Sequence, residues 1–230
     1  MFLAEDILYE DNHILVVNKR CGDLVQPSPD EDSALENEIK AFIKERDHKP
    51  GNVFLGVVHR IDRPVSGCVL FAKTSKALTR LNEMIRQSNI SKHYWAVVES
   101  QPQSDEGVLT HYLYRDGKSN HSKIFSTPGA ERKLARLNYK VLAKSDRYTL
   151  LDVELITGRH HQIRAQLSFI GCPIKGDLKY GAKRSNPSGG ISLHSRSMDF
   201  KHPVSKEDIK IVAPVPTDDN LWQFFEQSQS

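Results

Sequence analysis

Residues 59–67, with the sequence His-Arg-Ile-Asp-Arg-Pro-Val-Ser-Gly, constrain the fold of this chain more than any other stretch. They separate two short apolar runs, at 54–58 and at 68–72. Apolar runs of this length, bounded by turn residues, are typical of buried strands. We therefore predict that the charged segment is a loop held between two core strands, a place where functional side chains are often found.

The loop has one carboxylate, Asp62, close in sequence to the cationic side chains of Arg60 and Arg63. These neighbours favour the charged form of the carboxylate. Pro64 fixes its own φ and biases Arg63 toward an extended conformation, so we expect a stiffened loop. Asp62 could be a functional group or one half of a structural ion pair at a strand end, and residue types alone leave both interpretations open.

The segment resembles His-Arg-Leu-Asp-Arg-x-Thr-Ser-Gly, the signature of the RluA family of pseudouridine synthases. In that family the Asp is the catalytic residue, so the resemblance implies that Asp62 is catalytic. The Arg that matches Arg60 is thought to fill the place of a base flipped out of the RNA. We therefore assign Arg60, with its neighbours His59 and Arg63, to RNA binding. The resemblance continues in three further blocks in family order, the last of them at 172–181.

The first of these blocks is residues 91–99, whose alternation predicts a strand with Lys92 and Tyr94 on one face. It resembles Lys-x-Tyr-x-Ala-x-Val, in which the Tyr lies in the active site against the target base. The resemblance implies that Tyr94 is an active-site residue, and we assign Lys92 to RNA binding. Alternation by itself favours a core aromatic residue whose hydroxyl is satisfied.

The second block is residues 155–167, where a strand is predicted to end and a helix to follow, with apolar residues at helical spacing from Ile163 onward. Arg159 and the first helical N–H groups then converge near the strand end, a geometry suited to RNA phosphates. The block resembles Thr-Gly-Arg-x-His-Gln-Ile-Arg-x-His. In relatives the Arg of Gln-Ile-Arg sits beside the catalytic Asp, which implies that Arg164 is the partner of Asp62.

Two positions depart from the family pattern. Arg20 stands where the family has the Pro of Lys-Pro-x-Gly, here residues 19–22, and this leaves the geometry of that loop open. Gln166 stands where the family usually has His. The adjacent His160 and His161 are expected on different faces of a helix, which disfavours a metal site.

Charge is distributed unevenly along the chain, whose net charge is only +3. Residues 1–110 have 13 Lys and Arg against 17 Asp and Glu, whereas residues 111–230 have 19 against 12. Such an asymmetry fits a face that meets phosphates. It also fits an ordinary solvated surface, because Lys and Arg are common surface residues.

The overall pattern predicts one α+β domain over residues 1–230, with a mixed, mostly antiparallel sheet and flanking helices. The expected strands lie in a hairpin over 7–19 and at 91–99, 108–115, 136–143, 148–155, 191–200 and 209–213. Helices are expected from a capping box at Ser33 to about 47, from Thr74, from about 159 and near the C-terminus. The polar stretch 116–131 is expected to be an exposed, mobile loop.

The resemblance supplies the topology, that of the pseudouridine synthase catalytic fold. Only six residues precede the first predicted strand, so we expect the S4 RNA-binding domain of many relatives to be absent. No apolar run approaches the ~20 residues of a membrane span, and we expect a cytoplasmic protein. The three cysteines are far apart and lack C-x-x-C spacing, which indicates neither a disulfide framework nor a zinc site.

The resemblance implies that the chain isomerises uridine to pseudouridine in RNA, with Asp62, Tyr94 and Arg164 as the catalytic residues. It implies no cofactor, and we expect a monomer that acts on a stem-loop of rRNA or tRNA. The target base must be flipped out of its stack, because a stacked uridine is unreachable. Two other interpretations are an RNA-binding module without catalysis and a hydrolase that uses Asp62 and His59. The hydrolase would need a second carboxylate near the site, and the sequence shows no such pair.

Overall fold

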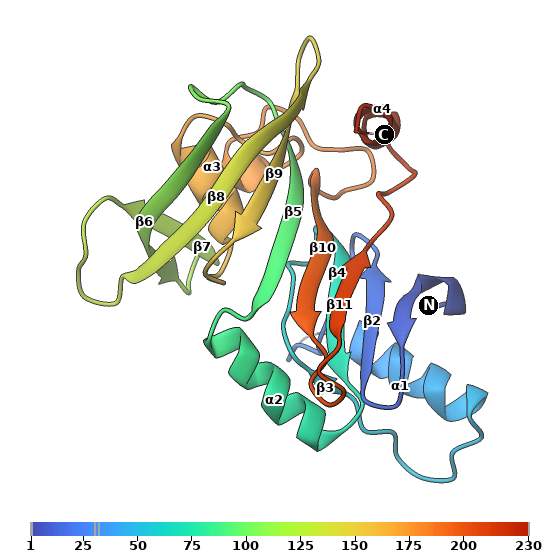
Figure 1. The fold of residues 1–230 in the computed structure, drawn as a ribbon. Helices are drawn as coiled ribbons and strands as arrows, with labels where there is room; N and C mark the ends of the chain where they lie inside the picture. Colours follow the sequence, from blue (N-terminus) through green and yellow to red (C-terminus); the bar gives the residue numbers. More distant parts are fainter. Residues whose placement is uncertain (1, 30, 32, 230) are drawn as a thin grey trace. The chain divides into compact units, whose positions relative to one another are not determined.

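The computed structural model describes residues 2–29, 31 and 33–229. These residues form two compact units. The first unit holds the chain up to Ile90 together with Ser195–Pro214, and the second holds Ser91–His194 together with the residues from Val215 onward. Each unit has its own antiparallel strand pairs and its own helices (Figure 1).

Strands of the first unit lie in the order β1-β2-β4-β10, with β11 beside β10 and β3 beside β4. The neighbours β1/β2, β2/β4, β3/β4 and β10/β11 are antiparallel. The elements are η1 (Ala4–Asp6), β1 (Ile7–Glu10), β2 (Ile14–Lys19), α1 (Leu35–Arg46), β3 (Gly56–Val57), β4 (Ser66–Ala72), α2 (Ser75–Arg86), β10 (Leu193–Lys201, from Ser195 in this unit) and β11 (Asp208–Val212).

Strand β4 lies at the centre of this unit's core, since every one of its residues is buried. It is the second of the two core strands predicted from the apolar runs. Helix α2 packs on the same core through Ala77 and Leu81. The helix begins where predicted, because Oγ1 of Thr74 accepts a hydrogen bond from the N–H of Ala77 at 3.2 Å. The strand and helix that follow the charged segment are thus confirmed.

Two local predictions in the first unit are wrong. The apolar run at 54–58 forms only the two-residue strand β3, and Phe54 is 48% exposed. Helix α1 has Ala34 as its N-cap, with no side-chain cap, so Ser33 does not form the expected capping box. The helix lies over the predicted residues nevertheless, because Leu35, Ile39 and Ile43 bury one face.

The described residues of the second unit form five antiparallel strands in the order β5-β9-β8-β6-β7 (Figure 1). They also form three short helical segments. Its strands are β5 (Ile90–Val98, from Ser91 in this unit), β6 (Glu106–Asp116), β7 (His121–Phe125), β8 (Lys133–Lys144) and β9 (Thr149–Leu155). Its helices are α3 (Gln162–Phe169), η2 (Leu178–Tyr180) and α4 (Asn220–Gln227).

Helices α3 and α4 cover opposite faces of these strands. Ala165 of α3 packs with Leu113 and Ala135, which share the face of Tyr94. Trp222 of α4 packs with Trp95 and other residues of the opposite face. The predicted α+β class with a mostly antiparallel sheet is therefore confirmed.

The stretch 116–131 is not simply the loop that its composition predicts. Residues His121–Phe125 form β7 and pair with the end of β6, from Tyr112 to Asp116. Ser122 is buried and Ile124 packs on the α3 side, so the segment alternates as a strand despite its polar composition. None of the helices among the described residues is both long enough and apolar enough to span a membrane.

Candidate functional site

Asp62 lies in the loop between β3 and β4 of the first unit, and the residue is half-buried. The turn after it is closed by the N–H of Val65, which donates to the carbonyl of Asp62 at 3.0 Å. Gly67 has a φ of 109°, and a Cβ there would overlap the backbone of Ser195. Glycine is therefore required where the loop enters β4.

Lys19, the last residue of β2, lies buried beneath this loop with 1% of its surface exposed. Its ammonium donates to the carbonyls of Arg20 at 2.8 Å, Asp23 at 2.8 Å and Arg63 at 3.1 Å. A Lys ammonium has three N–H donors, so these carbonyls use all of them. Because Arg63 directly follows Asp62, Lys19 fixes the position of the Asp62 loop.

The charge of Lys19 is sensitive to its surroundings. Burial lowers the pKa of Lys19 to about 8, while the carboxylates of Asp23 and Asp62 act in the opposite direction. The Asp62 charge is therefore close enough to influence Lys19. Lys19 is not among the site residues predicted from the sequence, although its place in the block at 19–22 is a usable signal.

The turn that follows Lys19 closes without the Pro of the family pattern. Arg20, which replaces that Pro, pairs with Asp6 of η1 at 3.0 Å. Gly22 adopts a φ of 93°, and its N–H donates to the carbonyl of Arg63 at 2.9 Å. The turn at residues 19–22 is therefore well defined although Arg20 replaces the Pro, and its backbone contacts the Asp62 loop.

The three residues assigned to RNA binding in this loop have different settings. Nε2 of His59 accepts a hydrogen bond from the N–H of Leu70 at 3.1 Å, which ties the loop to β4. Arg63 pairs with Glu31 at 3.0 Å and is exposed. Arg60 is also exposed. Arg60 is therefore accessible to solvent two positions before Asp62, while part of the Arg63 charge is already compensated.

Arg164 is in the second unit, on α3, and is 5% exposed. Its Nε donates to Oδ2 of Asp177 at 2.7 Å and its Nη2 donates to Oδ1 at 2.9 Å. Asp177 is 1% exposed. A planar guanidinium bound through two parallel hydrogen bonds has a fixed orientation. Asp177 is not among the site residues predicted from the sequence, although it lies in the family block at 172–181.

The other predicted site residues of the second unit lie on β5 and just before α3. Tyr94 is 6% exposed and pairs with Val153 across β5 and β9. Lys92 is half-buried on the same face, and burial lowers its pKa. Arg159 is exposed, and its Nε donates to the carbonyl of Leu134 at 2.9 Å.

The prediction for His160 and His161 is wrong, because both precede α3 instead of lying on it. His161 is the N-cap and adopts a left-handed conformation with a φ of 51°. The two rings stack with centroids 3.7 Å apart. The two side chains therefore lie against each other, and do not point to different faces of a helix.

Gln166, where the family usually has His, is completely buried. Its Nε2 donates to the carbonyls of Leu109 at 3.2 Å and Ala135 at 3.3 Å, and it lies 2.9 Å from Nδ1 of His111. These contacts join α3 to β6 and β8. Gln166 therefore supports the helix that holds Arg164.

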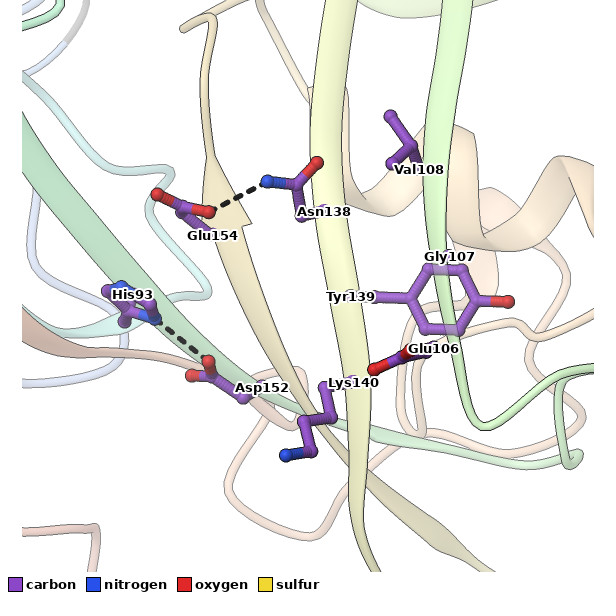
Figure 2. Close-up of a pocket in the computed structure, with 9 residues that line it drawn as sticks. All are labelled: His93, Glu106, Gly107, Val108, Asn138, Tyr139, Lys140, Asp152 and Glu154. Carbon is purple, nitrogen blue, oxygen red and sulfur yellow. Dashed lines mark hydrogen bonds and ion pairs between the residues drawn. The ribbon is translucent and has the colours of Figure 1, made fainter.

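A hollow of about 450 Å³ lies over β5, β6, β8 and β9 (Figure 2). It contains the pairs His93–Asp152 at 2.8 Å and Asn138–Glu154 at 2.7 Å. His93 neighbours Tyr94 on β5, and adjacent residues of a strand point to opposite faces. The hollow is therefore on the opposite face from Tyr94, and none of the predicted site residues lines it.

The predicted site residues are divided between the units. Asp62 and the arginines beside it belong to the first unit, and Tyr94, Arg164, Lys92 and Arg159 belong to the second. In the first unit the structure brings Lys19 to the Asp62 loop. In the second it brings Asp177 to Arg164. Asp62 and Arg164 thus each have a buried, charged residue close to them within their own unit.

Comparisons with known proteins give one consistent result. The profile of the family described as RNA pseudouridylate synthase matches residues 13–169. An uncharacterized RNA pseudouridine synthase of Bacillus subtilis, YlyB, is 35% identical over 93% of this chain and 70% of its own length. Ribosomal large subunit pseudouridine synthase D of Xylella fastidiosa is 34% identical over 93% of this chain and 66% of its own length.

One solved structure, human RNA Pseudouridylate Synthase Domain Containing 4, has a similar fold. The TM-score is 0.80 at 22% identity, and the match covers 99% of this chain and 94% of that one.

Proposed function

This chain belongs to the RNA pseudouridylate synthase family, and from this premise we propose that it isomerises uridine in large-subunit ribosomal RNA, with Asp62 as its catalytic carboxylate. The enzyme class itself, an RNA uridine isomerase, follows from the family. It replaces the two other interpretations of the sequence, a non-catalytic RNA-binding module and a hydrolase. The names of relatives such as synthases C and D support the large-subunit target.

The reaction is an isomerisation and needs no net change in atoms. The bond from N1 of uracil to C1′ of the ribose breaks, C5 bonds to the same C1′, and the proton on C5 is finally replaced by one on N1. In our proposal Asp62 acts either as the nucleophile or as the group that drives bond cleavage and proton movement. Both roles need a carboxylate held at one position relative to the nucleotide.

The observation that carries this proposal is the construction of the Asp62 loop. The buried ammonium of Lys19 binds the Arg63 carbonyl of this loop and the Arg20 and Asp23 carbonyls of the neighbouring turn, and Gly67 fixes the entry of the loop into β4. A purely structural ion pair at a strand end would not need a buried lysine that joins the backbone next to the carboxylate to a second turn. The loop is better explained as support for a preorganised functional group.

We further propose that Tyr94 and Arg164 act on the same uridine as Asp62. Tyr94 would contact the flipped base, and Arg164 would orient Asp62. Arg60 would occupy the place of the flipped base, because it is exposed and precedes Asp62 by two residues in the same loop. His59, Arg63, Lys92 and Arg159 complete the proposed RNA-binding set. In this proposal residues 1–230 work as one catalytic domain, as a monomer in the cytoplasm.

The test uses transcripts of large-subunit rRNA and of tRNA made with 5-tritiated uridine, since isomerisation releases the C5 tritium. We expect the wild-type protein to release tritium from the rRNA transcript. Pseudouridine-selective chemical labelling and sequencing would then locate the modified uridine. Release from tRNA alone would overturn the proposed target class, and equal release by Asp62→Asn would overturn the proposed catalytic residue.

A further inference from the structure

We propose that Tyr180 is a positioning residue for Arg164, and that it links the β6–β7 hairpin to the Arg164–Asp177 ion pair. Only the kinetic test of this inference depends on the proposed function. Tyr180, the last residue of η2, is 5% exposed. Its hydroxyl, ring and backbone each contact a different part of the surroundings of Arg164.

The hydroxyl of Tyr180 joins two segments through a defined pair of hydrogen bonds. It accepts from the backbone N–H of Ser122 at 2.8 Å. It also lies 2.9 Å from Nδ1 of His161. The Ser122 bond uses the oxygen as an acceptor, which leaves the single hydroxyl proton free for His161. Our proposal assigns this proton to the bond with Nδ1 of His161, so that Nδ1 accepts and the ring proton is on Nε2.

The surroundings of His161 favour a neutral ring, as the proposal requires. Burial lowers the pKa of His161 to about 2, and the positive charge of Arg164 acts in the same direction. A neutral ring adds no second positive charge beside Arg164. The left-handed backbone of His161 is strained for a residue with a side chain, and such strain persists where surrounding contacts hold it. The hydrogen bond from Tyr180 is one of those contacts.

The ring and backbone of Tyr180 reach both members of the ion pair. Cζ of Arg164 lies over the Tyr180 ring, 5.0 Å from its centroid. The N–H of Tyr180 donates to the carbonyl of Asp177 at 3.0 Å. A shift of Tyr180 would therefore change the surface on which the guanidinium lies and the turn that presents the Asp177 carboxylate. Arg164 has little freedom to compensate, because it is itself buried.

The β6–β7 hairpin contacts the same tyrosine. The ring of His121 stacks on Tyr180, with centroids 4.3 Å apart. Oγ of Ser122 donates to the carbonyl of His160 at 2.6 Å, and Nζ of Lys179 donates to the carbonyl of Asn120 at 3.1 Å. The turn between these strands includes the exposed Lys118. RNA bound at this turn would thus be mechanically connected to Arg164 through Tyr180.

The kinetic test compares Tyr180→Phe with Tyr139→Phe. The first variant keeps the ring and removes only the hydroxyl. Tyr139 is a matched control, because it is also buried in the second unit and its hydroxyl donates to the carbonyl of Ser104 at 3.3 Å. We expect both variants to lose a similar amount of thermal stability. Single-turnover rates at saturating enzyme are measured on tritiated large-subunit rRNA transcript, well below the melting temperatures.

We expect Tyr180→Phe to lower that rate by about tenfold to a hundredfold, since a displacement of about 1 Å can reduce catalysis that much. RNA affinity should stay as in Tyr139→Phe. Equal rates for the two variants would overturn the proposal, because a structural hydroxyl would affect stability alone.

A second measurement does not depend on the variant or on the RNA. In ¹⁵N spectra of the wild-type protein, the His161 ring should be the neutral Nε2–H tautomer throughout pH 5.5 to 8. A ring that is protonated on Nδ1, or that titrates in this range, would overturn the hydrogen-bond network. If the rRNA transcript were not a substrate, the proposed target would fail, and the spectra would still decide the positioning network.

Discussion

Arg164 and Asp177 form a two-point ion pair in which both side chains are almost completely buried. Asp177 fixes the plane of the guanidinium, because Nε and Nη2 bind its two carboxylate oxygens. In our proposal this plane decides how Arg164 meets Asp62. The ion pair therefore has consequences for both stability and catalysis, and the two are separable by substitution.

Arg164→Lys should reduce catalysis much more than RNA affinity. Lysine keeps the positive charge, but a single ammonium cannot reproduce the planar two-point contact. The measurement is the single-turnover rate at saturating enzyme, alongside the dissociation constant for the rRNA transcript. An unchanged rate would contradict a role for Arg164 in orienting Asp62.

Arg164→Met should be less stable than wild type by about 3–5 kcal/mol, because it leaves the buried Asp177 carboxylate without its partner. Urea denaturation gives the free energy of unfolding. The double variant Arg164→Met/Asp177→Asn is the control, and it should recover part of the loss because no buried charge is left unpaired. A double variant as unstable as the sum of the two single variants would contradict this account.

Asp62→Asn should abolish tritium release and leave RNA binding unchanged. The substitution keeps the size of the side chain and removes the carboxylate that the proposed chemistry requires. Circular dichroism and a binding assay would show whether the variant folds and binds RNA. Tritium release at the wild-type rate would rule out Asp62 as the catalytic group.

RNA binding should weaken steeply with salt, by roughly 0.7 to 0.9 log units per log unit of salt for each phosphate contact. Arg60→Ala should make this slope shallower by about the amount expected for one phosphate contact. Arg46→Ala is a suitable control, because Arg46 already pairs with Glu10 at 2.7 Å in the same unit. A slope that is unchanged in Arg60→Ala, or lowered as much in Arg46→Ala, would contradict the role of Arg60.

Lys19 should change the pH dependence of stability between about pH 8 and 10.5. Its pKa is about 8 in the folded protein, below the ordinary value of 10.5. In this window the unfolded chain binds the proton and the folded protein does not, so the free energy of unfolding rises with pH by up to about 1.4 kcal/mol per unit. Denaturation at pH 8 and 10 should show this rise in wild type relative to Lys19→Met. Parallel pH profiles for the two proteins would contradict it.

Local sequence patterns predicted a large part of this fold. The charged segment between apolar runs gave the Asp62 loop, and Thr74 gave the start of α2. Alternation placed Tyr94 on one face of a strand, and the structure buries it. These features depend on neighbours a few residues away, because strand alternation and helix capping are local properties of the backbone. Patterns of this kind failed at β7, where pairing with β6 outweighs a polar composition.

The partners of the functional side chains were decided by tertiary structure. Sequence indicates that Arg164 is on a helix, but only packing brings Asp177 and Tyr180 to it across a turn. Lys19 could be read as a surface residue at a strand end, yet the fold encloses it with the carbonyl of Arg63, 44 positions away. Buried charges and hydrogen-bond donors must find partners wherever the chain supplies them. Periodicity indicates which way a side chain points, whereas packing determines what lies opposite to it.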